Sequence, residues 1–240
     1  MTLHLHRDLA TVRKSILEMG GMVEDLVRLS SEALVQRRPD VAHQVIQADA
    51  DVDRQELEVD EECLKLLALH QPVAGDLRFI TAVMKINNDL ERIGDLASNL
   101  AQRALDLLDQ PFVDAPLRFE EMTAAVRGML RDSLDALVRG DAERARAVIA
   151  KDDEVDSMNR EHFRVLEDRM KADPVLVEAC VLYLSASRNL ERMADLATNV
   201  AEDVVFMVDA VVLRHWRVTH ADEDPSPAAG RPVDSPTDRS

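Results

Sequence analysis

One segment of this chain occurs twice, one hundred residues apart. The first copy is DLERIGDLASNLAQ from Asp89 and the second is NLERMADLATNVAE from Asn189, and eight of the fourteen positions are identical. Self-similarity at a fixed offset indicates duplication, so the chain should fold into two similar halves. The identical positions include two acids four residues apart, which a helix places on one face about 6 Å apart along its axis. Stability alone does not favour such like-charge pairs.

The composition favours helices. Among 240 residues there are only 7 glycines, and aromatic residues make up 3%. Long proline-free stretches carry apolar residues every three or four positions, which is typical of amphipathic helices. We therefore predict an all-α fold of two tandem, pseudo-twofold-related three-helix bundles, 1–110 and 115–217, joined by short hairpin turns. The acidic, proline-rich tail 218–240 is predicted to be disordered.

Prolines and glycines set the expected helix boundaries. We predict helices over 3–37, from an N-cap at Asp40 to His70, and over 75–108, with a linker at 109–117. In the second half we predict helices over 117–138, over 141–172 as one piece, and from Asp173-Pro174 to about 217. Cys63 and Cys180 stand alone inside helical patterns and are predicted to be buried thiols rather than a disulfide or a zinc site.

The charge balance limits the partners. With a formal net charge of −17 the surface repels nucleic acid and anionic lipid headgroups, so no direct binding to either is expected. An anion could be handled only through a bridging cation. No segment has the length and composition of a transmembrane span or a signal peptide, which predicts a cytoplasmic protein without direct membrane insertion.

The paired acids are predicted to lie outside the core. On a helical wheel the apolar positions of 86–107 fill one arc, and Asn87, Glu91, Asp95 and Asn99 fall on the opposite arc. Each half also carries a second acidic pair on the preceding helix. The eight candidate carboxylates are Asp49, Asp53, Glu91 and Asp95 in the first half and Asp152, Asp156, Glu191 and Asp195 in the second.

Four carboxylates from two neighbouring helices make an all-oxygen site, with Asn99 or Asn199 as a further ligand. Such a site suits Mg²⁺, Mn²⁺, Ca²⁺ or iron. Two alternatives stay open: a metal-dependent hydrolase, which would need a general base and a concave pocket, and a passive helical scaffold whose acids only solubilise it. The Glu-x-x-His pairs of di-iron oxidases and the common nucleotide-binding and hydrolase motifs are absent from the sequence.

Several segments together resemble the PhoU family of phosphate-uptake regulators. They are LEMGGMVED (17–25), ADADVD (48–53), QPVAGDLRFITAVMKINNDLERIGDLASNLA (71–101) and NLERMADLATNVAE (189–202). The resemblance covers about 5–215 and leaves the tail outside.

This resemblance implies two three-helix bundles with multinuclear metal clusters, typically of iron or zinc, on the acidic motifs. It also implies a non-enzymatic cytoplasmic adaptor, often a homodimer, that lies at the inner face of the membrane through its partners. Those partners would be the ATPase of a phosphate ABC transporter and a membrane sensor histidine kinase, and the adaptor would keep the phosphate-starvation response off. The chain departs from a perfect repeat at Asn189 for Asp89 and at Ala194 for Gly94, so the two sites are expected to differ.

Overall fold

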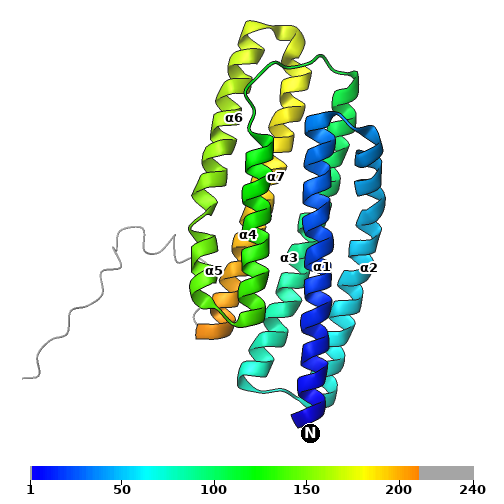
Figure 1. Ribbon diagram of the computed structural model, residues 1–240, viewed down its shortest axis with the longest axis vertical. Helices are drawn as coiled ribbons and strands as arrows, with labels where there is room; N and C mark the ends of the chain where they lie inside the picture. The colour runs from blue at the N-terminus through cyan, green and yellow to red at the C-terminus, as the bar shows by residue number, and fades with distance from the viewer. Residues whose placement is uncertain (1, 211–240) are drawn as a thin grey trace, which may run out of the picture.

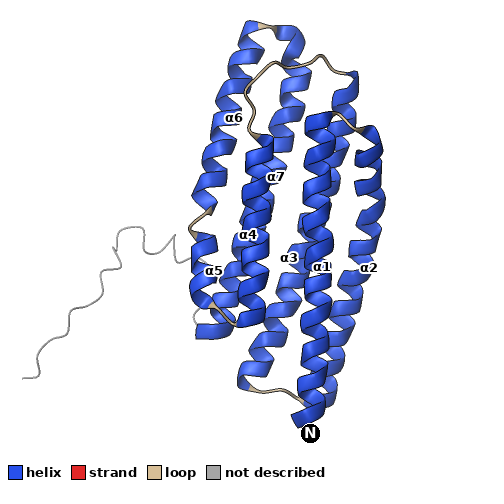
Figure 2. Ribbon diagram, in the orientation of Figure 1, coloured by secondary structure: helices blue, strands red, loops and turns tan. Residues whose placement is uncertain are grey.

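The computed structural model describes residues 2–210, and every regular element within them is helical (Figures 1 and 2). The helices are α1 (Thr2–Gln36), α2 (Pro39–His70), α3 (Ala74–Asp106), α4 (Phe119–Arg139), α5 (Ala142–Ile149), α6 (Asp152–Ala172) and α7 (Val177–Asp209). Short 3-10 turns at Leu107–Asp109 and Pro174–Leu176 follow α3 and precede α7. The all-α prediction is confirmed. The expected extension of the last helix to 217 and the tail 218–240 lie outside the described residues.

The helices form two groups that lie side by side. In the first half α1, α2 and α3 all contact one another, and in the second half α4, α5 and α6 all pack against α7. The halves meet where α3 packs along α7 and where α1 packs along α4. In Figure 1 the turn from α2 to α3 and the turn from α6 to α7 lie at opposite ends of the long axis. The two halves therefore run in opposite directions, as an approximate twofold perpendicular to that axis requires.

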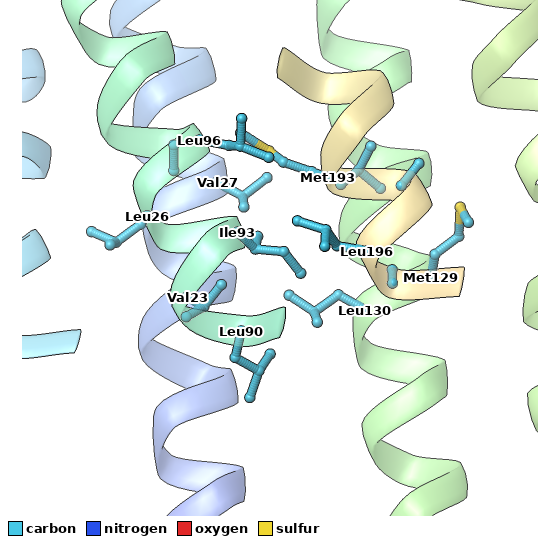
Figure 3. Packing of buried hydrophobic residues seen from close by; sticks show 14 of the residues in the cluster. Val23, Leu26, Val27, Leu90, Ile93, Leu96, Met129, Leu130, Met193 and Leu196 are labelled. Atoms are coloured by element: carbon cyan, nitrogen blue, oxygen red, sulfur yellow. The ribbon is translucent and has the colours of Figure 1, made fainter. Parts of the chain in front are cut away.

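A continuous apolar core joins the two halves. Figure 3 shows Leu90, Ile93 and Leu96 of α3 beside Met193 and Leu196 of α7, with side chains of α1 and α4 around them. All five of these side chains are buried. Burying a side chain of this size stabilises the fold by about 1.5–3 kcal/mol, so this layer contributes to holding the two halves together.

The start of α2 differs from the prediction. Asp40 was expected to be the N-cap, but the helix begins at Pro39, and Arg38 occupies the cap position with extended backbone. Proline suits the first helical position because its φ is already helical and its missing N–H would have no partner there. Asp40 lies in the first turn, where the helix dipole favours an acid, and its carboxylate pairs with Arg38 at 2.6 Å.

The helix predicted over 141–172 is broken into α5 and α6. Asp141 is the N-cap of α5, since its carboxylate accepts a hydrogen bond from the Arg144 amide at 3.0 Å. The break comes at Ala150 and Lys151, where the Lys151 amide bonds the carbonyl of Val148 at 2.9 Å, a three-residue turn. No glycine or proline marks it. The only signal is the acidic run after Lys151, which is typical of a new helix N-terminus.

The thiols are as predicted: Cys63 and Cys180 are buried and unpaired. Within residues 2–210, none of the helices has the length and apolar character that a membrane crossing requires.

Candidate functional site

The first acidic cluster lies where α2 packs against α3. Glu91 and Asp49 are half-buried, whereas Asp53 and Asp95 are exposed at the edge of the same contact. Burial raises the pKa of Asp49, and the charges of Asp95 and Asp53 raise it further. Burial raises the pKa of Glu91 as well, followed by the charge of Asp95. The structure thus brings the four predicted carboxylates of the first half into one electrostatic group.

Sequence reasoning missed a fifth member of this cluster. Glu56 is half-buried on α2, its charge helps to raise the pKa of Glu91, and its own pKa is raised by burial and by Asp60 and Asp53. The spacing Asp49, Asp53, Glu56, Asp60 follows the four-three-four pattern of one helix face, so the signal was present. Each added carboxylate increases both the repulsion in the metal-free protein and the number of oxygen ligands.

The second cluster lies where α6 packs against α7. Burial raises the pKa of Asp195 to about 6, with further contributions from Glu191, Asp152 and Asp156. Burial also raises the pKa of Glu191, although Arg188 opposes the effect from an ion pair at 3.8 Å. The four predicted carboxylates of the second half are therefore also brought together.

The two clusters are not equivalent. Asn159 stands in the second half where the repeat places Glu56 in the first, and Arg188 stands where Asn88 stands. The second cluster accordingly has one carboxylate fewer and one cation more. Asp156 is also engaged, since Arg160 donates to it at 3.3 Å. A cation should therefore be attracted more strongly to the first cluster.

A hydroxyl contacts the innermost acid in both halves. Thr198 donates to Asp152 at 3.4 Å, and a hydrogen bond from Ser98 partly offsets the raised pKa of Asp49. Asp49 also lies close to Gly94, where an added Cβ would stand 3.5 Å from its Oδ1. The absence of a side chain at Gly94 thus lets α2 approach α3 at this acid, whereas Ala194 occupies the matching place on α7.

The oxygen chemistry fits a hard cation. Asp49 Oδ1 and Glu191 Oε2, one in each cluster, are buried oxygens that accept no hydrogen bond within residues 2–210, although Arg188 lies 3.8 Å from Glu191 Oε2. A buried carboxylate oxygen without a donor is costly, and a metal ion satisfies it. As the side chains stand in the described part of the chain, no group of three or more acidic, histidine or cysteine side chains is arranged as a metal site. Metal binding would therefore need the carboxylates to change rotamer, and it stays a prediction.

Asn87 was predicted to share the outer polar arc, and this is wrong. It is fully buried, and its amide donates to the carbonyl of Glu56 at 2.8 Å and to the Asp60 carboxylate at 3.1 Å. The wheel assigned it outward because it is polar. The packing of α2 across that edge of α3 buries it, and hydrogen bonds to α2 offset the cost.

Asn99 and Asn199, which were predicted to complete the two separate clusters, line one cleft between α3 and α7. This cleft of about 310 Å³ is lined by four residues from each helix. They are Arg92, Asp95, Leu96 and Asn99 with Arg192, Asp195, Leu196 and Asn199. The cleft is thus built from the same four residue types twice, and it joins the outer ends of the two clusters through Asp95 and Asp195. The two arginines were not among the residues predicted to form a site.

A buried histidine and a buried cysteine lie outside the clusters. His162 is fully buried, accepts a hydrogen bond from the Arg118 amide at 2.8 Å and contacts the Ser187 hydroxyl at 3.0 Å. Burial raises the pKa of Cys63 to about 12, so that thiol is not a nucleophile near neutral pH. The clusters themselves consist of carboxylates, which suit cation binding.

Comparison with known proteins agrees with the resemblance found in the sequence. The PhoU domain matches the chain twice, over 16–104 and 119–204. A phosphate-specific transport system accessory protein PhoU homolog from Pseudomonas putida is 37% identical over 211 residues, 87% of this chain and 82% of that protein. The homolog from Pseudomonas aeruginosa is 36% identical over 220 residues, 90% of each chain.

Solved structures agree with the fold. The crystal structure of PhoU from Pseudomonas aeruginosa matches with a TM-score of 0.80 at 36% identity, covering 86% of this chain and 99% of that one. The phosphate transport system regulatory protein PhoU from Streptococcus pneumoniae matches with a TM-score of 0.78 at 25% identity, over 87% and 98% of the two chains. Both repeats, the helical order and the sequence therefore lead to one conclusion: this chain belongs to the PhoU family.

Proposed function

We propose that this protein is a metal-binding accessory regulator of phosphate uptake that acts by docking rather than by catalysis. The observation that carries the proposal is the likeness along nearly the whole chain to proteins named for accessory roles in phosphate-specific transport. Two long helical bundles offer extended faces for partners, and the clustered carboxylates offer cation sites between those faces.

The partners proposed from the family are the ATPase of a phosphate ABC transporter and a membrane sensor histidine kinase. The protein would act as a cytoplasmic homodimer at the inner face of the membrane and keep the phosphate-starvation response off when phosphate is ample. An adaptor of this kind needs no nucleophile. It needs surfaces whose contacts depend on the state of the transporter.

The proposed metal is a divalent or trivalent cation, iron or zinc by family resemblance, with Mg²⁺, Mn²⁺ and Ca²⁺ also suited to the oxygen ligands. Asp49, Asp53, Glu91 and Asp95 would hold it in the first cluster. Asp152, Asp156, Glu191 and Asp195 would do so in the second cluster. The raised pKa values of Asp49, Glu91, Glu191 and Asp195 support this, because burial and, after it, neighbouring carboxylate charges disfavour the ionised form, and a cation would favour it.

Mn²⁺ binding measured by calorimetry and by thermal unfolding tests the metal sites. Wild-type protein stripped with a chelator should gain thermal stability with Mn²⁺, since a ligand that binds only the folded state stabilises it. The double variant Glu91→Gln/Asp95→Asn should lose the tighter class of sites and keep the fold. A matched variant, Glu58→Gln/Asp168→Asn, removes two exposed acids outside the clusters and should respond like the wild type. An unchanged Mn²⁺ response in the first variant would mean that these are not the ligands.

A reporter of phosphate-starvation genes tests the regulatory role. Deletion of the protein should leave the reporter on in rich phosphate, and the full-length chain should switch it off again. Phosphatase activity in the purified, metal-loaded protein would instead favour the hydrolase alternative. A protein that neither binds metal nor affects the reporter would be the passive scaffold.

A further inference from the structure

The cleft between α3 and α7 has the geometry of a single site made by both repeats. Each half contributes an arginine, an aspartate, a leucine and an asparagine at positions one hundred residues apart. Leu96 and Leu196 are each only 5% exposed and form the apolar floor, which continues into the core layer of Figure 3. A volume of about 310 Å³ is at the small end for a ligand site and suits a small ligand with its water molecules better than a nucleotide.

The polar groups of the cleft divide into two kinds. Arg92 and Arg192 present guanidinium groups, whose planar donor array matches the oxygens of a tetrahedral oxyanion. Arg92 makes one long ion pair, at 3.5 Å to Asp89, and within residues 2–210 Arg192 makes no ion pair. Both side chains are exposed, so both can turn toward a ligand at modest cost. The asparagine amides add neutral donors on the same two helices.

Opposing these donors are Asp95 and Asp195, which line the same cleft. Their two charges cancel those of the arginines, and the half-buried Glu91 and Glu191 behind them make the surroundings negative. An anion is therefore disfavoured in the cleft of the metal-free protein. A cation bound in each cluster would neutralise the aspartates at the edge of the cleft and leave the guanidinium groups as its dominant charges.

We propose that this cleft binds inorganic phosphate, held between Arg92 and Arg192, and that it does so only when cations occupy the two acidic clusters. The inference rests on the proposed metal sites and adds the ligand that they would govern. A wider groove of about 790 Å³ adjoins the cleft: it shares Arg92 and Asn199 with the cleft and is also lined by Lys85, Asp89 and Glu202. The protein would then respond to phosphate and metal together.

Equilibrium dialysis with radiolabelled orthophosphate tests this on the full chain, with Mn²⁺ held below the concentration that precipitates phosphate. Chelator-treated protein should bind no phosphate, and Mn²⁺-loaded protein should bind about one per chain. The variant Arg92→Met/Arg192→Met should keep its Mn²⁺ binding and helical content. It should lose phosphate affinity by at least about 10-fold, because each guanidinium supplies charge-assisted hydrogen bonds. Arg164→Met, an exposed arginine of α6 outside the cleft, is the matched control.

The outcomes separate this inference from the proposed function. Mn²⁺ binding without phosphate binding overturns the phosphate site alone, as does undiminished phosphate binding in the double variant. Absence of Mn²⁺ binding overturns the proposed metal sites, and phosphate binding to the chelated protein overturns the dependence on metal. Phenyl phosphate, which mimics a phosphorylated side chain of a partner, should bind more weakly than orthophosphate. Tighter binding of phenyl phosphate would overturn free phosphate as the ligand.

Discussion

Asp195→Asn should stabilise the metal-free protein, against the usual direction of a substitution at a candidate functional site. Burial and the charges of Glu191, Asp152 and Asp156 raise the pKa of Asp195 from 3.8 to about 6. A shift of about two units corresponds to about 3 kcal/mol of preference for the neutral form. Because the side chain is exposed at the cleft, solvent screening reduces this, and we expect about 1 kcal/mol. For a protein of this size that raises Tm by about 2–4 °C at pH 7.5.

The effect of Asp195→Asn on the free energy of unfolding should also depend on pH. A carboxyl whose pKa is raised on folding holds its proton more tightly in the folded protein than in the unfolded chain. The free energy of unfolding of the wild type should therefore gain a contribution from Asp195 as the pH falls from about 7 to about 4, below which the contribution is constant. The variant lacks this contribution, so its advantage over the wild type should shrink across the same window and vanish near pH 4.

Thermal and urea unfolding of chelator-treated protein, followed by circular dichroism, provide the measurement. Glu58→Gln, an exposed acid of α2 outside the clusters, is the control and should change Tm by less than about 1 °C. High salt should reduce the gain, since it screens exposed charges. With Mn²⁺ the order should reverse, because the wild type then gains binding energy that the variant lacks. A variant less stable than the wild type at pH 7.5 without metal would refute the repulsion argument.

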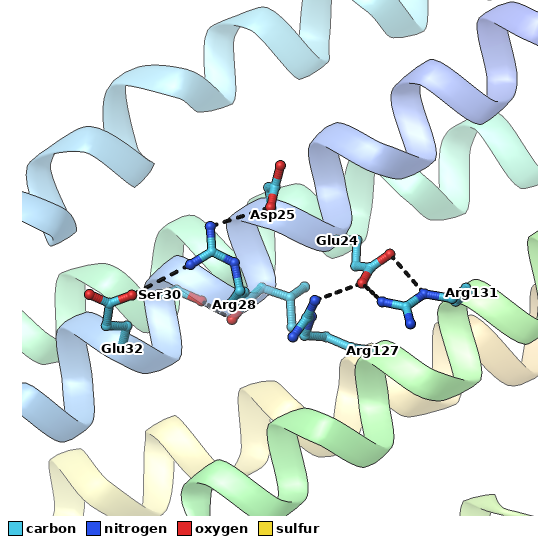
Figure 4. A network of polar contacts seen from close by, with 8 residues as sticks. Glu24, Asp25, Arg28, Ser30, Glu32, Arg127 and Arg131 are labelled. Carbon is cyan, nitrogen blue, oxygen red and sulfur yellow. Dashed lines mark hydrogen bonds and ion pairs between the residues drawn. The ribbon is translucent and has the colours of Figure 1, made fainter.

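Two further predictions concern how stability depends on pH at the buried His162 and at the Glu24 ion pairs between α1 and α4. His162 is buried, which lowers its pKa, and its Nε2 accepts a hydrogen bond from the Arg118 amide, so it must stay neutral. The contribution of His162 to stability should therefore be lost as the pH drops below about 6.5. His162→Gln should cost about 1–3 kcal/mol at pH 7.5, and in urea titrations this cost should shrink as the pH falls below about 6.5. Burial would raise the pKa of Glu24, but hydrogen bonds from Arg131 and Arg127 outweigh it and lower the pKa (Figure 4). Glu24→Gln should cost about 1 kcal/mol at pH 7.5, and the cost should disappear as the pH falls below about 4, because the wild-type carboxylate is then lost too.

Helical periodicity and proline spacing predicted most of this fold because both act locally. Long proline-free apolar stripes left few alternatives to helices, and the repeat required two related halves. The break between α5 and α6 at Lys151 was not predicted, because no glycine or proline marks it. The remaining signal is an acidic run, which also fits the interior of an exposed helix. The predicted start of α2 was two residues too late, because proline and aspartate both suit a helix N-terminus but at different positions.

The clusters were predictable for the same local reason, and the cleft was not. Acids four apart must share a helix face, so Asp49 with Asp53 and Glu91 with Asp95 followed from spacing. Spacing along one helix does not determine which neighbouring helix packs against each of its edges. The packing of α2 on α3 buries Asn87. The packing of α3 on α7 brings Arg92 and Arg192 into the same cleft.

The identities between the two repeats separate packing from function. Core positions need only an apolar side chain of suitable size, and in the fourteen-residue segment they have diverged from Ile93 to Met193 and from Leu100 to Val200. Exposed positions need still less. Yet the arginine, aspartate and asparagine that line the cleft are identical in both halves, whereas Glu56 and Asn88 in and beside the first cluster correspond to Asn159 and Arg188. Stability alone does not require polar side chains to be retained in this cleft, where the two halves face each other. The ligand proposed for the cleft would require these residues in both halves, because it would be contacted by the same residue of each repeat at once.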